Sequence, residues 1–98
     1  MVTCYHRLDN LEDLRQYVYS TLCKHSQLEL GAYQMTETTL LRGHRPCGVY
    51  FCVCGPRKMR LSAIWDSDRN QVLFYDSAGD RFQKTQLASG PRLRSIAA

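Results

Sequence analysis

The chain has 98 residues, a length that predicts one domain, and its 44% hydrophobic and 22% charged residues exclude intrinsic disorder. No apolar run approaches the roughly 18 residues that a membrane-spanning helix needs, and the first residues lack the continuous apolar segment of a signal peptide. The net charge of +4 permits a polyanionic partner without selecting one. We therefore expect a cytoplasmic protein with no membrane association, whose odd count of five cysteines stays reduced.

The first predicted element is a helix over residues 9–24. Its apolar stripe, at three- and four-residue spacing, consists of Leu8, Leu11, Leu14, Val18 and Leu22. Asp9 or Asn10 can cap its first turn, because a short side-chain oxygen accepts a hydrogen bond from an otherwise unpaired backbone N–H. We expect the stripe to pack on the rest of the domain, with its central residues in the core.

The remainder of the chain predicts strands separated by short turns, at the spacing typical of antiparallel hairpins. The predicted strands are 28–41, 47–54, 59–66, 71–76 and 81–88. No second helix is long enough for a parallel crossover. Residues 1–90 are therefore predicted to form one α+β domain, with one N-terminal helix packed on an antiparallel meander of four to five strands. We expect residues 91–98 to form a flexible basic tail.

The alternation of side chains predicts which face of the sheet the helix covers. In 59–65, Leu61, Ala63 and Trp65 share the face that should meet the helix. Strands 47–54 and 71–76 are apolar on both faces, and one helix covers only one of them. The second face then exposes Tyr50, Ile64 and Tyr75, unless the tail or the N-terminal segment folds over it.

The run "RPCGVYFCVCGPRKMRLSAIWDSDRNQVLFYDSAGDRF", from Arg45 to Phe82, resembles a pattern found in small uncharacterised bacterial proteins. The segments "GPR", "AIW" and "FYDSAGDRF" carry the resemblance. It covers a little over a third of the chain, and it implies no activity, cofactor, partner or functional residue.

The cysteines are the first candidates for chemistry. Cys52 and Cys54 share one face of a strand, and Cys47 and His44 are the nearest further zinc ligands. However, Cys47 should point to the opposite face of an unbroken strand, and structural zinc sites usually draw on a tight C-x₂₋₄-C turn. Buried structural thiols are the favoured interpretation, and we expect no cofactor. No cysteine, serine or histidine lies in a recognisable catalytic context, so we expect no enzymatic activity.

Nucleic-acid binding is a second candidate function. Arg45, Arg57, Lys58 and Arg60 supply positive charge, and aromatic side chains nearby could stack on bases. Each end of the predicted sheet, however, mixes basic and acidic turns, which favours a solvated surface with local ion pairs.

The favoured function is a small non-enzymatic protein-interaction module. An uncovered apolar sheet face or an unpaired edge strand tends to find a partner. Of the two predicted edges, the one near Lys84 is protected by charge, whereas the strand "MTETTLL" is less so. We therefore expect a homodimer, or docking on a protein partner, through Tyr50, Ile64 and Tyr75 or through that edge. Single-stranded nucleic-acid binding and a zinc or thiol site remain the alternatives.

Overall fold

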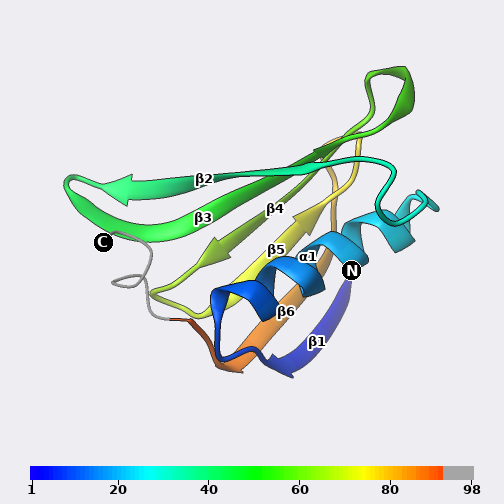
Figure 1. Ribbon diagram of the computed structural model, residues 1–98. Helices are drawn as coiled ribbons and strands as arrows, with labels where there is room; N and C mark the ends of the chain where they lie inside the picture. Colours follow the sequence, from blue (N-terminus) through cyan, green and yellow to red (C-terminus); the bar gives the residue numbers. More distant parts are fainter. Residues whose placement is uncertain (92–98) are drawn as a thin grey trace.

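The computed structural model describes residues 1–91, which form one α-helix and six strands in a single sheet (Figure 1). In chain order the elements are β1 (Val2–Arg7), α1 (Leu11–His25), β2 (Met35–Arg42), β3 (Arg45–Cys54), the 3₁₀ turn η1 (Pro56–Lys58), β4 (Arg60–Asp66), β5 (Gln71–Tyr75) and β6 (Arg81–Ser89). The α+β class with one helix is confirmed. The predicted tail lies, apart from Pro91, outside the described residues.

The strand order is β1-β6-β5-β4-β3-β2, and β1 runs parallel to β6. The prediction of four to five antiparallel strands is therefore wrong in number and in direction. Strands β2 to β6 form the expected meander, but residues 2–7 add a sixth strand beside the last one. This strand was missed because nearly all its side chains are exposed, so that no buried alternation marks it. Backbone hydrogen bonds to β6, which would otherwise be an unpaired edge, account for its pairing.

The helix begins at Leu11, because Asn10 rather than Asp9 caps it. The Asn10 side-chain oxygen accepts a hydrogen bond from the backbone N–H of Asp13 at 2.8 Å. Acidic residues in the first turn and basic residues in the last both suit the helix dipole. Within residues 1–91 no helix is long and apolar enough to cross a bilayer, and α1 itself has only 15 residues.

The segment 26–34 is a loop, although the sequence predicted a strand from residue 28. Gln27 has a φ of 57° and Gly31 a φ of 88°, and both values turn the backbone away from an extended path. Tyr19 holds the loop from α1, because its hydroxyl donates to the Tyr33 carbonyl and accepts from the Gly31 N–H at 2.9 Å. The apolar Leu28, which suggested a strand, instead packs against the core from this loop.

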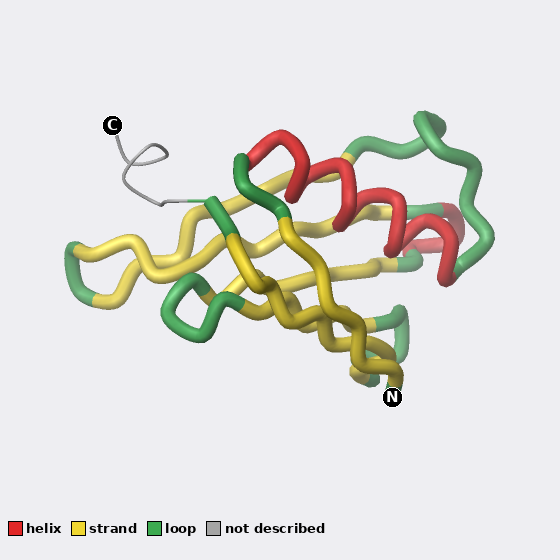
Figure 2. The backbone as a smooth tube through the Cα atoms, turned by 90° about the horizontal axis from the view of Figure 1, so that it is seen from below, coloured by secondary structure: helices red, strands yellow, loops and turns green. Residues whose placement is uncertain are grey.

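The core lies between α1 and one face of the sheet, as Figure 2 shows by the position of the helix on one side of the strands. The residues predicted to meet the helix are all buried, and Trp65 has no exposed surface. Its indole N–H donates to Asn70 Oδ1 at 3.3 Å. The core consists of Leu14, Val18, Leu22, Val49, Phe51, Val53, Leu61, Ala63, Trp65, Val72, Phe74 and Leu87.

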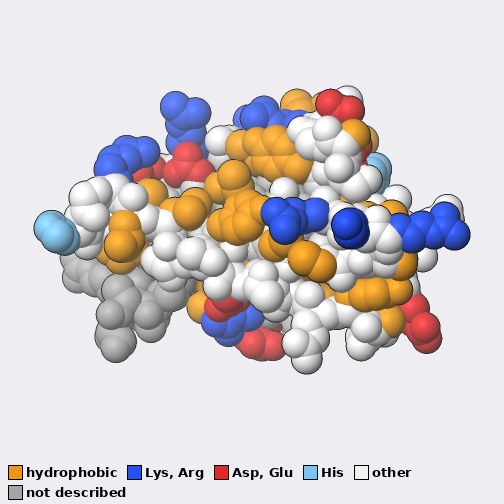
Figure 3. All heavy atoms as spheres, turned by 90° about the horizontal axis from the view of Figure 1, so that it is seen from above, with side chains coloured by type: hydrophobic (Ala, Val, Ile, Leu, Met, Phe, Trp, Pro, Cys, Tyr) orange, Lys and Arg blue, Asp and Glu red, His pale blue; other side chains and the backbone are white. Residues whose placement is uncertain are grey.

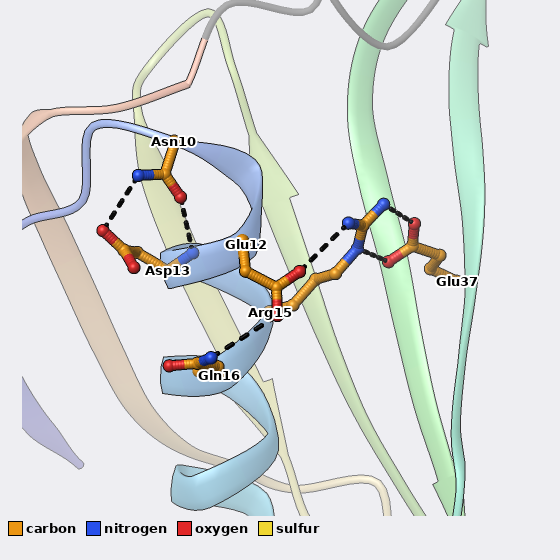
Figure 4. A network of polar contacts seen from close by, with 6 residues as sticks. All are labelled: Asn10, Glu12, Asp13, Arg15, Gln16 and Glu37. Atoms are coloured by element: carbon orange, nitrogen blue, oxygen red, sulfur yellow. Dashed lines mark hydrogen bonds and ion pairs between the residues drawn. The ribbon is translucent and has the colours of Figure 1, made fainter.

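An ion pair ties the helix to the edge strand β2. Arg15 Nε and Nη2 donate to the two carboxylate oxygens of Glu37 at 2.7 and 2.6 Å, and Arg15 also lies 3.6 Å from Glu12 (Figure 4). Such a two-point guanidinium–carboxylate pair fixes geometry as well as charge. It places a charge on the helix side of the edge strand, which is one way in which proteins discourage edge-to-edge pairing.

The two edges of the sheet are β1 and β2 (Figure 1). The expectation that the Lys84 region forms an edge is wrong, because β1 pairs with β6 along residues 83–89. The N-terminal segment therefore extends the sheet and does not fold over its second face.

Candidate functional site

The sheet face opposite α1 is the first candidate site, and we call it the open face. Strand register and alternation assign it Thr3, Tyr5, Thr36, Thr38, Leu40, Gly48, Tyr50, Cys52, Cys54, Arg60, Ser62, Ile64, Asp66, Gln71, Leu73, Tyr75, Arg81, Lys84 and Gln86. No helix or strand of residues 1–91 lies over this face (Figure 2). It is therefore the part of the sheet that is available to a partner.

Apolar side chains occupy the centre of the open face. Tyr50, Ile64 and Leu73 lie side by side in register across β3, β4 and β5. Tyr75, one pair further along β5, is covered in part by Arg81, whose guanidinium carbon lies 5.5 Å from the ring centroid. These four side chains are half-buried, so neighbours in the sheet shield them only partly from water.

The three predicted interaction residues, Tyr50, Ile64 and Tyr75, thus lie together on one face. Leu73 joins them and was not chosen from the sequence as an interaction residue. Its alternation with the buried Val72 and Phe74 was the signal that could have found it.

The cysteines lie apart. Cys52 is on the open face and only 8% exposed, and Cys54, on the same face, is exposed. Burial, followed by the neighbouring Cys54 thiol, raises the pKa of Cys52, which disfavours a reactive thiolate. Cys47 is the extra residue of a β-bulge in β3, and His44 is exposed in the turn before that strand. Across residues 1–91 no three His, Cys, Asp or Glu side chains gather to hold a metal ion, so the zinc alternative gains no support.

The basic residues predicted for nucleic-acid binding also separate. Arg45 donates to both carboxylate oxygens of Asp68, at 3.0 and 3.1 Å, and these bonds lower the pKa of Asp68. Arg57 and Lys58 are exposed in η1, with φ values of 57° and 61°. Of the four predicted residues, only Arg60 lies on the open face. Figure 3 shows basic side chains beside hydrophobic ones on the side of the molecule that it presents.

A second candidate site is a groove of ≈ 490 Å³ on the helix side of the sheet, between β1, α1 and β6. It forms because α1 packs over β3 and β4 and leaves space beside it, above the β1–β6 pair. The groove is lined by Val2, Cys4, Tyr17, Thr21, Lys24, His25, Phe82 and Gln83. The groove was not predicted from the sequence, because its walls meet only when β1 pairs with β6. Tyr17, Thr21 and Lys24 do share one helix face by their spacing, which was the available signal.

Polar groups converge at the floor of this groove. Tyr17 Oη lies 2.8 Å from Thr85 Oγ1, and Gln83 Nε2 donates to both oxygens at 3.1 Å. The His6 ring packs on the ring of Tyr17, with 4.5 Å between centroids. At the groove's other end the His25 and Phe82 rings stack at 3.6 Å with 6° between their planes.

A scan against protein-family models finds no match for this chain, and searches of curated proteins and of solved structures find none either. The open face and the groove are therefore the features from which a function can be inferred.

Proposed function

We propose that the protein is a small non-enzymatic interaction module that forms a homodimer through the open face. The observation that carries the proposal is the half-buried row of Tyr50, Ile64 and Leu73, which is continuous across three strands and has no cover among residues 1–91. Burying such a row against a partner removes apolar surface from water.

Charge placement favours a second copy as the partner. Arg60 and Asp66 lie on the open face at opposite ends of β4. Consider two copies stacked face to face, related by a two-fold axis that lies between the sheets and runs across the strands. The two β4 strands then lie over each other and run in opposite directions. Arg60 of one copy then meets Asp66 of the partner subunit, and symmetry repeats the contact. Backbone N–H groups of Asp68 and Arg69 already hold the Asp66 carboxylate in place through its Oδ1.

The size of the face predicts a weak dimer. Six strands spaced about 4.8 Å apart span roughly 25 Å, and the strands extend for about 20 Å, so the plan area is about 500 Å². A stable interface usually buries about 800 Å² on each partner, and smaller ones belong to transient complexes. We therefore expect association in the micromolar range.

Light scattering across a dilution series tests this proposal. The wild type should rise towards twice the chain mass of 11.3 kDa as concentration increases. Ile64→Lys and Arg60→Glu should both lower the mass at a given concentration while circular dichroism stays unchanged. Leu30→Lys is the matched control, because Leu30 is 53% exposed in the α1–β2 loop, outside the open face.

A charge pairing makes the test more specific. Asp66→Asn keeps the oxygen that accepts the turn hydrogen bonds but removes the negative charge. Added to Arg60→Glu, it should partly restore the dimer, because the new glutamate no longer faces a carboxylate of the partner subunit. A mass near one chain at every concentration would refute the proposal. An equal effect of Leu30→Lys and Ile64→Lys would show that the open face is not the contact.

Single-stranded nucleic-acid binding is a second candidate, favoured by the aromatic and basic composition of the open face. Tyr50 and Tyr75 could stack on bases, with Arg60 and Lys84 beside them, and Asp66 is the single acidic residue assigned to the face. This candidate predicts binding of an oligothymidylate that weakens steeply with added salt. Such binding by a chain that stays monomeric would replace the dimer proposal.

A further inference from the structure

The groove between β1, α1 and β6 carries an inference that is independent of the open face. We infer that it binds a small organic carboxylate, with Tyr17 and Lys24 as the groups that hold the anion. The groove lies on the helix side of the sheet, so its occupation does not depend on dimer formation.

The hydrogen bonds at the groove floor leave one donor free. Thr85 has no exposed surface, and the one acceptor for its hydroxyl proton within the described chain is Tyr17 Oη. Gln83 donates to the same Tyr17 oxygen. The 2.8 Å contact admits either hydroxyl as the donor, but only donation by Thr85 gives its buried proton an acceptor. With that assignment Tyr17 Oη accepts two hydrogen bonds, and its own O–H is left to donate into the groove.

This hydroxyl is well suited to bind an anion. Two accepted hydrogen bonds polarise an O–H group and strengthen the bond that it donates. Burial raises the pKa of Tyr17, so the phenol keeps its proton at neutral pH. A hydrogen bond to a charged acceptor is stronger than one to a neutral acceptor. The position of the free donor therefore favours a carboxylate oxygen over a neutral carbonyl.

The charge of the lining points the same way. Lys24 and His25 are basic or ionisable residues of the last turn of α1, and no Asp or Glu lines the groove. Lys24 follows Tyr17 by seven residues, which is two helical turns. The two residues therefore lie on the same face of α1, about 10 Å apart along its axis. Lys24 carries its charge on a flexible four-carbon stem, and it lines the same groove as Thr21 and Tyr17. A carboxylate between the two groups would take one contact from each.

The remaining walls suit an apolar body. Val2 and Cys4 line the groove from β1, and Phe82 lines it from β6, with its ring fixed by the stack on His25. A volume of ≈ 490 Å³ is within the range of small-molecule pockets, about 300–1,000 Å³. The ligand class is therefore a compact organic acid with one carboxylate on an apolar or aromatic body.

Benzoate is the probe for this site, with benzamide as its neutral match and inorganic phosphate as a second anion. In amide ¹H–¹⁵N spectra, benzoate should shift residues of β1, the second half of α1 and the start of β6, and the shifts should saturate. Benzamide and phosphate should cause no such shifts. Lys24→Gln should weaken benzoate binding about tenfold or more, since a hydrogen bond to a charged group has a strength of that order. Lys58→Gln, an exposed lysine in η1, is the matched control and should bind as the wild type does.

Tyr17→Phe removes only the hydroxyl and should weaken benzoate about as much as Lys24→Gln does. Because that change leaves the buried Thr85 hydroxyl without an acceptor, Tyr17→Phe with Thr85→Val is a second form of the test. The Gln83 amide loses both of its acceptors in this double variant, but Gln83 lines the groove and can donate to water there. Unchanged affinity in the Lys24 and Tyr17 variants would overturn the inference, as would shifts spread over all basic residues or no shifts at all. The Ile64→Lys chain should bind benzoate as the wild type does, so failure of the dimer proposal and failure of this one are distinguishable.

Discussion

Leu14 offers a direct test of how α1 is held on the sheet. It has no exposed surface and belongs to the core, together with Val18 and Leu22 from the same helix. Leu14→Ala removes three carbon groups that are fully shielded from water. Among residues 1–91 the sheet is the one layer against which the helix buries its apolar stripe, so the lost contacts are not replaced elsewhere in that part of the chain.

The size of the effect follows from the burial. Removing three buried carbons costs about 2.4 kcal/mol in transfer free energy, at about 0.8 kcal/mol for each. The cavity that remains adds to this, so the free energy of unfolding should fall by about 2–5 kcal/mol. For a domain of this size, each kcal/mol lowers the melting temperature by about 4–8 °C.

Urea denaturation followed by fluorescence is a suitable assay, because Trp65 is the one tryptophan and is fully buried against the same core. Leu30→Ala is the control, since Leu30 is 53% exposed and should lose less than about 0.5 kcal/mol. A loss below about 0.5 kcal/mol in Leu14→Ala would refute the packing of this helix on the sheet.

Two further predictions concern the sheet and its turns. Gly48→Ala should destabilise the protein by about 1–3 kcal/mol or more, because a Cβ there would overlap a backbone carbonyl of the paired strand β4. Calorimetry measures this loss, and a variant as stable as the wild type would contradict the close approach of the two strands. Hydrogen bonds from Arg45 lower the pKa of Asp68 below its ordinary value of 3.8. The pair therefore stabilises the folded protein fully at pH values above 3.8. This contribution is lost as the pH falls from 3.8 through the lowered pKa of the folded state. Asp68→Asn should therefore be less stable than the wild type at pH 7, and urea denaturation should show this difference shrink as the pH falls below 3.8. A difference that stays constant as the pH falls would argue against the ion pair.

The sequence by itself determined the elements whose patterns are local. The apolar stripe of α1 and the alternation in β3, β4 and β5 placed Leu14, Val18 and Trp65 in the core, and the same alternation put Tyr50 and Ile64 on the other face. These patterns can be read from sequence because each element buries one side, and burial imposes the period of a helix or a strand on the residue types.

Only the tertiary structure decided the features that join distant segments. β1 is exposed on nearly every side chain, so no hydrophobic period marks it, and its backbone pairs with β6 more than 80 residues later. The Arg15–Glu37 pair and the Tyr17–Thr85 hydrogen bond likewise link side chains 22 and 68 positions apart. Hydrogen bonds of this kind depend on which backbone and side-chain groups meet in space, and composition and spacing do not encode that. For this reason the open face was partly predictable from the sequence, whereas the groove, whose walls come from β1, α1 and β6, was not.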